Sequence, residues 1–208
     1  MTATKKTTTR KKASTTKKVT ATTPKKVVAQ KIPDLPRNPF AYEVLDAVSK
    51  MRSKANKVEV IRRYGDNSLK AILIWNFDES IVTLLPEGEV PYGSNIEDET
   101  KTGSLSGKIN DAVSKMNELG TQSLGSQDQG STTIRKEFTK FYNFLKGGNP
   151  GMSSLRRESM FINILQGLHP LEAEILILVK DGRLTDKYKI TKDVVSEGFP
   201  DIAWGGRG

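Results

Sequence analysis

The residues most suited to phosphate chemistry lie in residues 146–158, KGGNPGMSSLRRE. Gly147, Gly148 and Gly151 come just before a serine pair typical of a helix N-cap, and Arg156 and Arg157 fall in the first turn of that helix. Free backbone N–H groups at a helix N-terminus, together with two guanidinium groups, could bind a phosphate. A turn between two helices, in which the glycines permit positive φ and the arginines are solvated, is the favoured interpretation. Arg156 and Arg157 are retained as candidate phosphate contacts.

Few other residues could take part in catalysis or metal binding. The chain has no Cys and a single His, His169, which excludes a thiolate metal site and any site built from several His of one chain. His169 directly precedes Pro170, where a helix is expected to begin, so a capping or surface role is favoured over a general base. The acidic stretch Glu97, Asp98 and Glu99 could hold a divalent cation, but a solvated loop is favoured. No nucleotide-binding glycine motif is present, and we expect no catalytic residue, metal or cofactor.

The N-terminal part of the sequence is a strongly basic arm. Residues 1–31 hold ten Lys and Arg and no Asp or Glu, whereas the whole chain has 33 basic and 24 acidic residues. Residues 32–208 therefore hold 23 basic and 24 acidic side chains, so the net positive charge of the chain belongs to the arm. The ten basic residues of the arm are Lys5, Lys6, Arg10, Lys11, Lys12, Lys17, Lys18, Lys25, Lys26 and Lys31.

The composition of the arm predicts disorder and binding to a polyanion. It has too few apolar side chains to offset the cost of ordering a backbone, about 1–2 kcal/mol per residue. Each Lys that neutralises a phosphate releases counterions, so binding to nucleic acid needs no folded geometry. No aromatic residue lies in residues 1–31, which excludes base stacking by the arm. We therefore expect non-specific, salt-sensitive binding to a DNA or RNA backbone; a solubilising tail and an anionic membrane surface are the alternatives.

The sequence does not predict a membrane-spanning or secreted protein. No apolar run approaches the ~20 residues of a transmembrane helix. The arm lacks the apolar core of a secretory signal. A soluble, intracellular protein with no membrane partner is expected.

Helical periodicity dominates after a proline-rich connector over residues 33–39. Apolar residues recur at spacings of three and four in segments that begin near Phe40, Lys54, Asp66, Ser131, Ser153, Pro170 and Thr191. Two segments, KAILIWNF and the ILILV run, are apolar on nearly all sides and also fit strands, but their flanking residues favour helices. The sequence predicts an all-α fold, a compact bundle of about seven or eight short helices.

Residues 93–130 interrupt this pattern. They are rich in Ser, Gly and polar residues and are interpreted as a flexible insertion, within which KINDAVSKMNEL could form a lone amphipathic helix. The expected organisation is a disordered arm and connector over residues 1–39, helical parts over 40–92 and 131–208, and the insertion between them.

The C-terminal stretch, GFPDIAWGGRG, is predicted to be irregular. It carries Phe199, Ile202 and Trp204, and a short apolar-aromatic tail can dock in a groove of a partner protein. The alternative is that Trp204 folds back onto the body, because large aromatic side chains are usually covered. These three residues are candidate partner contacts.

Three stretches of the body carry a resemblance to a known group of proteins. They are residues 42–92, beginning YEVLDAVSKM, the segment beginning KFYNFLKGG at residue 140, and YKITKDVVSEGFP. These stretches resemble a family of small uncharacterised proteins from T4-like marine bacteriophages, to which the arm and residues 93–130 look like additions. The resemblance implies a phage-encoded protein in the cytoplasm of an infected bacterial host, and it implies no activity, catalytic residue or ligand.

These observations predict a non-enzymatic phage accessory protein. Its helical body would contact a phage or host protein while the arm tethers it to nucleic acid. The alternative is a virion structural or assembly component whose arm contacts packaged DNA.

Overall fold

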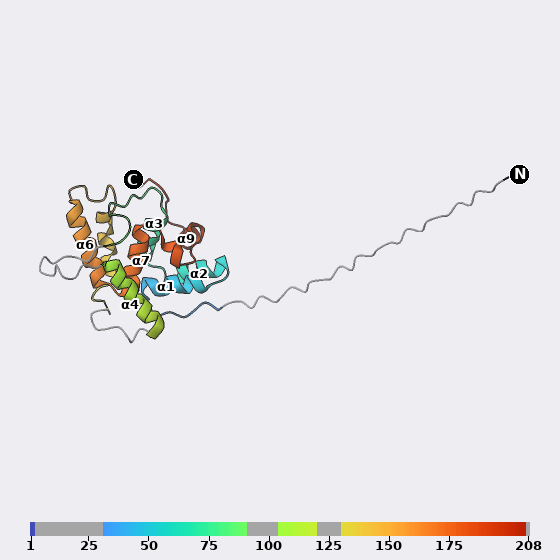
Figure 1. Ribbon diagram of the computed structural model, residues 1–208, viewed down its shortest axis with the longest axis horizontal. Helices are drawn as coiled ribbons and strands as arrows, with labels where there is room; N and C mark the ends of the chain where they lie inside the picture. The colour runs from blue at the N-terminus through green and yellow to red at the C-terminus, as the bar shows by residue number, and fades with distance from the viewer. Residues whose placement is uncertain (3–30, 91–103, 120–129, 207–208) are drawn as a thin grey trace.

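The computed structural model describes residues 1–2, 31–90, 104–119 and 130–206 (Figure 1). Within these residues the fold is all-α, as the sequence predicts. Its elements are α1 (Ala41–Lys50), α2 (Lys54–Tyr64), α3 (Asn67–Phe77), α4 (Leu105–Leu119), α5 (Ile134–Glu137), the 3-10 helix η2 (Phe138–Phe144), α6 (Ser154–Gly167), α7 (Pro170–Lys180), α8 (Leu184–Lys187) and α9 (Lys192–Gly198). No helix in these ranges is long and apolar enough to cross a membrane.

Helix α7 lies at the centre of the body (Figure 1). It contacts α1, α3, α4, α6 and α8. Its residues Ala173, Ile175, Leu176 and Val179 are 1 % exposed or less. A helix that is apolar on most sides is stable in water only when neighbours surround it. The helical alternative is thus confirmed for the ILILV run, and equally for KAILIWNF, which forms most of α3.

Helices α2 and α9 approach each other unusually closely. A Cβ atom on Gly198 would lie 2.5 Å from Cγ2 of Ile61, and one on Gly65 would lie 2.5 Å from the ring of Phe199. Neither contact distance is sterically allowed, so both positions require glycine. Gly65 ends α2 as the sequence predicts, with its N–H bonded to the carbonyl of Ile61.

The segment after Ser131 departs from the single α-helix that its pattern suggests. It forms one α-helical turn, α5, followed by the 3-10 helix η2. Because a 3-10 helix has three residues per turn, Phe141 and Phe144 share its buried edge and pack around Trp75 and Phe161. Tyr142, which α-helical spacing would place on the apolar face, is 53 % exposed.

Within the stretch that the sequence analysis interprets as a flexible insertion, residues Leu105–Leu119 form helix α4, which packs into the body. The expected amphipathic helix forms, but it is not alone, because it packs on α7. Its buried residues include Leu105, Ile109 and Val113 of the apolar core, and Leu105 N–H bonds to the carbonyl of Val90. The remainder of residues 93–130, apart from Ser104 and Gly130, lies outside the described residues.

Residues 78–90 form turns, bends and extended segments and no helix. Thr83 forms an isolated antiparallel bridge with Leu145, and its hydroxyl accepts a hydrogen bond from the indole of Trp75. The buried ammonium of Lys180 donates to the carbonyls of Pro86 and Gly88. These contacts replace helical hydrogen bonds and hold the segment against the body.

Candidate functional site

A cavity of about 250 Å³ lies where α1, α3 and α5 begin. Its lining includes Phe40 and Ala41 of α1, Asp66 and Ser68 at the start of α3, and Arg135 of α5. Glu172, from the first turn of the central helix α7, also faces it. Because helix N-termini carry free N–H groups and partial positive charge, carboxylates are the groups that they attract.

Glu172 lies in the first turn of α7 and hydrogen-bonds to the N-termini of two other helices, α1 and α5. Its carboxylate accepts from Ala41 N–H at 3.2 Å and from Ile134 N–H at 2.9 Å, and the residue is 1 % exposed. Burial raises the pKa of this carboxyl above its ordinary value, although the two backbone N–H groups oppose that shift. Glu172 therefore caps α1 and α5 from a position 131 residues away from Ala41.

Asp66 and Arg135 form the second polar contact of the cavity. The Asp66 carboxylate caps α3 by accepting from Leu69 N–H at 2.8 Å, and it accepts from Ser68 and from Arg135 Nε. Burial alone would raise the pKa of Asp66, but these hydrogen bonds and the guanidinium charge outweigh it and lower the pKa. Arg135 also donates to the carbonyl of Pro39. The oxygens of both carboxylates are thus occupied by donors of the fold, which makes the cavity a structural junction.

His169 is the N-cap of α7, the capping role that the sequence favours. Its Nδ1 accepts from Leu171 N–H at 3.2 Å. The imidazole is buried and stacks on Tyr42, with ring centroids 5.1 Å apart. Burial lowers the pKa of His169, with a smaller opposing effect from Glu43. In the described residues, no group of three or more His, Asp or Glu is arranged to hold a metal ion, and Glu97, Asp98 and Glu99 lie outside them.

The two candidate phosphate contacts at the start of α6 have different environments. Ser153 caps the helix as predicted, and Arg156 is exposed. Arg157 is only 6 % exposed, and it donates to the carbonyls of Asn143, Asn149 and Met152. The expectation that Arg157 is solvated or contacts phosphate is therefore wrong. Its guanidinium closes the turn between η2 and α6, because a planar group with five donors can satisfy several carbonyls at once.

The candidate partner contacts at the C-terminus pack on the body. Ile202 is buried, and Phe199 and Trp204 are half-buried against the apolar core. Lys192 lies over the Trp204 ring at 5.1 Å, and Gly205 N–H donates to the carboxylate of Asp78. The folded-back alternative describes this tail, because these contacts cover the apolar surface that a partner would bind.

The basic arm lies almost entirely outside the described residues. Of its ten cations only Lys31 is described, and it is exposed. The connector that follows is held by Tyr64, whose hydroxyl donates to the carbonyl of Pro33 and accepts from Leu35 N–H. Residues 33–35 therefore lie beside α2.

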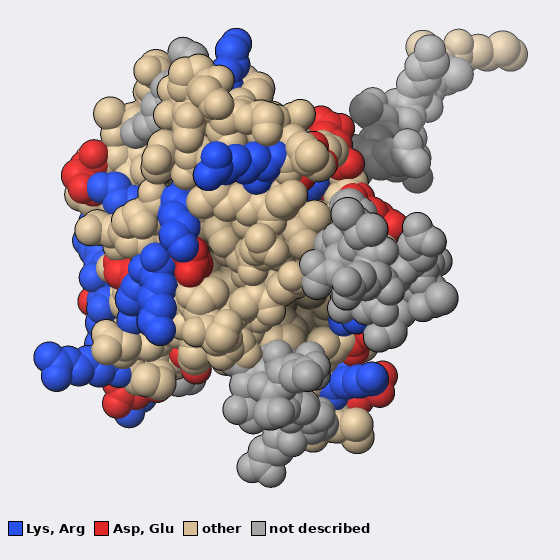
Figure 2. Space-filling model, turned by 90° about the vertical axis from the view of Figure 1, so that its left-hand side faces the viewer, with Lys and Arg blue, Asp and Glu red and all other residues tan. Residues whose placement is uncertain are grey.

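The body also contains a basic segment that the net charge conceals. Residues 131–157 hold six Lys and Arg against one acidic residue, Glu137. The segment comprises α5, η2 and the start of α6, and Lys and Arg side chains gather on the face of the molecule where α6 lies (Figure 2). A count of charges in short windows would have found this segment, whereas the near-zero charge of residues 32–208 averages it away.

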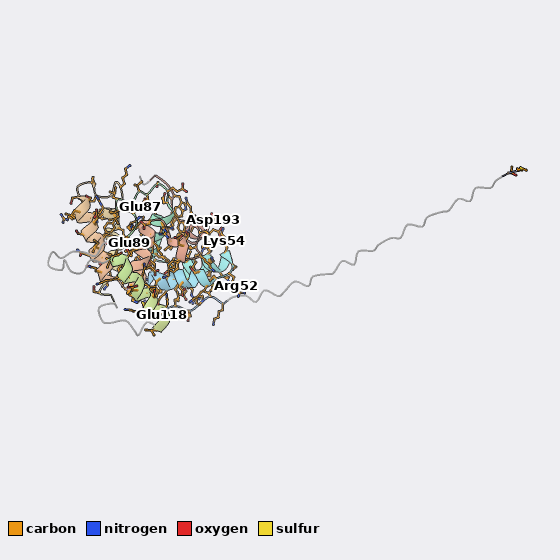
Figure 3. All side chains as sticks on the ribbon, in the orientation of Figure 1. Arg52, Lys54, Glu87, Glu89, Glu118 and Asp193 are labelled. Atoms are coloured by element: carbon orange, nitrogen blue, oxygen red, sulfur yellow. The ribbon has the colours of Figure 1, made fainter. Side chains whose placement is uncertain are left out.

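The opposite end of the body is different. Lys54 of α2 forms an ion pair with Glu197 and lies near Asp193 of α9 (Figure 3). Lys57 and Arg62 of α2 donate to backbone carbonyls of Lys189 and Glu197. Lys54, Lys57 and Arg62 thus contact α9 or the residues before it, and Arg63 of α2 pairs with Asp34 of the connector.

Comparison with known proteins places the chain in one family. No curated protein and no solved structure matches it. A family model matches residues 44–119 and 120–186, so residues 93–130 belong to the family pattern and are no addition to it, whereas the basic arm lies outside the match. The chain is a member of a family of unknown function, DUF6433.

Proposed function

We propose that this protein is a non-enzymatic, phage-encoded accessory protein. Its basic arm tethers it to nucleic acid in the cytoplasm of an infected bacterium. The helical body positions the arm and contacts a phage or host protein. The proposal rests on the charge of residues 1–31, which hold ten Lys and Arg and no Asp or Glu. A polycation of this kind gains affinity for phosphates by counterion release and needs no fixed geometry.

The junction at Glu172 supports a structural role for the body. Carboxylates, which could act as acid or base in an enzyme, here accept hydrogen bonds from the N-termini of α1, α3 and α5. The ionisable groups of the cavity are committed to the fold, and this favours a binding protein over an enzyme.

The test compares three full-length proteins in duplex DNA binding across a salt series. In one variant the nine cations between Lys5 and Lys26 are replaced by Gln, and in another the residues of the arm are permuted at constant composition. If about half of the arm's cations engage the duplex, the slope of log K against log salt is roughly −4 to −5 for the wild type. The neutral arm is expected to lose most of this slope, and the permuted arm to keep it.

Two results would contradict the proposal. One is a neutral-arm variant that binds the duplex as tightly as the wild type, and the other is a wild-type affinity that salt does not change. Mass spectrometry of purified phage particles addresses the alternative role, because a virion component would be abundant in them.

A further inference from the structure

Three cations of the basic segment are free to bind a ligand. Arg157 is buried, Arg135 pairs with Asp66, and Lys140 pairs with Glu137. The cations that remain are Lys136, Lys146 and Arg156, which are exposed and form no ion pair among the described residues, although the charge of Lys136 acts on the Glu137 carboxylate. Exposed cations without local partners are the groups that bind phosphates in solution.

An exposed aromatic ring accompanies these cations. Tyr142 of η2 is 53 % exposed, and no aromatic or cationic side chain in the described parts of the chain covers its ring. Beside this segment, Val82 is 47 % exposed, and its carbonyl accepts from Lys146 N–H at 2.9 Å. An exposed aromatic ring provides a surface on which a nucleobase can stack.

The buried Arg157 joins the elements that carry these residues. Its Nε donates to the carbonyl of Asn143 at 2.7 Å, which joins the end of η2 to the first turn of α6. Tyr142 precedes Asn143, and Arg156 precedes Arg157, so the exposed ring and the exposed guanidinium flank this contact on the two elements. Lys146 lies in the turn between them. Because the three residues belong to a hydrogen-bonded junction, their backbones are fixed before any ligand binds.

We propose that Tyr142, Lys146 and Arg156, with Lys136 at the edge, form a binding site for single-stranded nucleic acid. The ring of Tyr142 stacks on an unpaired base, and the cations contact the adjacent phosphates. A duplex does not fit, because its bases are stacked on each other and present no free face. This inference rests on the proposed function in that nucleic acid is the partner, but the residues are different: the arm has no aromatic side chain, whereas Tyr142 gives this site a ring that can distinguish single strands from duplexes.

The experiment measures fluorescence anisotropy of an oligothymidine of about 20 nucleotides, long enough for such a site, and of a duplex of equal length. Full-length wild type is compared with Y142A, Y142F and the double variant K146A/R156A. A double variant K115A/K189A, which removes two exposed cations outside residues 131–157, is the matched control for charge. Each variant is also made with the neutral arm.

Y142A is expected to weaken oligothymidine binding about tenfold, and Y142F to leave it nearly unchanged, because stacking needs the ring and not the hydroxyl. Duplex binding of Y142A should stay at the wild-type level. K146A/R156A should reduce the salt slope for the single strand by about 1.4, and the control should not. Thermal melting of each variant verifies that the body is folded.

The site proposal is overturned if Y142A binds oligothymidine like Y142F, or if it weakens duplex binding equally. It is also overturned if polyglutamate competes with oligothymidine and its binding shows the same dependence on Tyr142, since the surface would then recognise acidic protein. The tether is tested separately. If neutralising the arm does not change nucleic-acid binding, the tether is refuted, while the difference between Y142A and Y142F still tests the site on the body.

Discussion

Two junctions of this body are each closed by a buried ion, and they differ in what they leave at the surface. At the first, the carboxylate of Glu172 collects the N–H groups at the starts of α1 and α5. At the second, the guanidinium of Arg157 collects three carbonyls between η2 and α6. Around Glu172 the cation Arg135 is paired with Asp66 and the exposed Lys136 lines the cavity, whereas Lys146 and Arg156 near Arg157 form no ion pair among the described residues. Both buried groups hold the fold together, and the exposed cations beside them are the ones that a phosphate can reach.

Replacing Glu172 should have the largest effect. E172A leaves Ala41 N–H and Ile134 N–H without their acceptor inside the core, and we expect a loss of about 3 kcal/mol in the free energy of unfolding. E172Q keeps the shape and one acceptor oxygen, so its loss should be about half as large. Denaturant unfolding followed by circular dichroism measures both. Equal stability of wild type and E172A would show that the junction does not depend on this carboxylate.

Replacing Arg157 should have the next largest effect. R157M fills similar space but donates to none of the three carbonyls, and we expect a loss of about 2 kcal/mol. R157K should recover little of it, because a single ammonium cannot match the planar fork. If R157M unfolds at the same denaturant midpoint as the wild type, the hydrogen bonds of Arg157 do not stabilise the turn between η2 and α6.

The titration of His169, the N-cap of α7, should have a smaller effect on stability. Burial lowers the pKa of His169 below its ordinary value of 6.5, so the folded protein binds this proton less tightly than the unfolded chain. Stability from this residue is therefore fully present above pH 6.5 and is lost as the pH falls through the folded pKa. The raised pKa of Glu172 acts in the opposite direction, since its contribution declines as the pH rises above 4.5 through the folded value.

Because the chain has one His, an NMR titration of the imidazole measures this pKa directly. H169N keeps an acceptor at the N-cap of α7 and should flatten the pH dependence of stability below 6.5. An imidazole that titrates at or above the ordinary value would contradict the buried, uncharged cap.

The smallest effect on stability is expected for Arg156. It is exposed, so R156M should change the free energy of unfolding by less than about 0.5 kcal/mol. The same denaturant titration that measures R157M provides the value. If R156M lost as much free energy of unfolding as R157M, Arg156 would support the fold as Arg157 does, and the two cations would not differ in role.

Three start signals of the sequence form the expected caps, whereas Thr191 precedes α9 without a side-chain cap and α5 begins only at Ile134. Ser153, His169 and the aspartate at residue 66 cap α6, α7 and α3, because a cap bonds to N–H groups two or three residues away. The amphipathic pattern of α4 is equally readable. Its packing on α7 was missed, because a hydrophobic face predicts burial without saying against which element.

The partners of Glu172 and Arg157 could not be predicted in the same way. The position of Glu172 in the first turn of α7 indicates only a favourable interaction with that helix, whereas its hydrogen bonds go to Ala41 and Ile134. The 3-10 geometry of η2 likewise depends on tertiary contacts, because the packing of Phe141 and Phe144 around Trp75 selects three residues per turn. This choice exposes Tyr142 and thereby creates the candidate stacking surface.

The all-α class, several helix starts and the concentration of charge in the arm can be predicted from the amino-acid sequence, because they follow from composition and from interactions between residues a few positions apart. Which ionisable side chains are buried as caps depends on packing, because desolvation and hydrogen bonding involve neighbours that are distant in the chain. Packing therefore distinguishes the buried Arg157 from the exposed Arg156, although the two residues are adjacent and chemically identical.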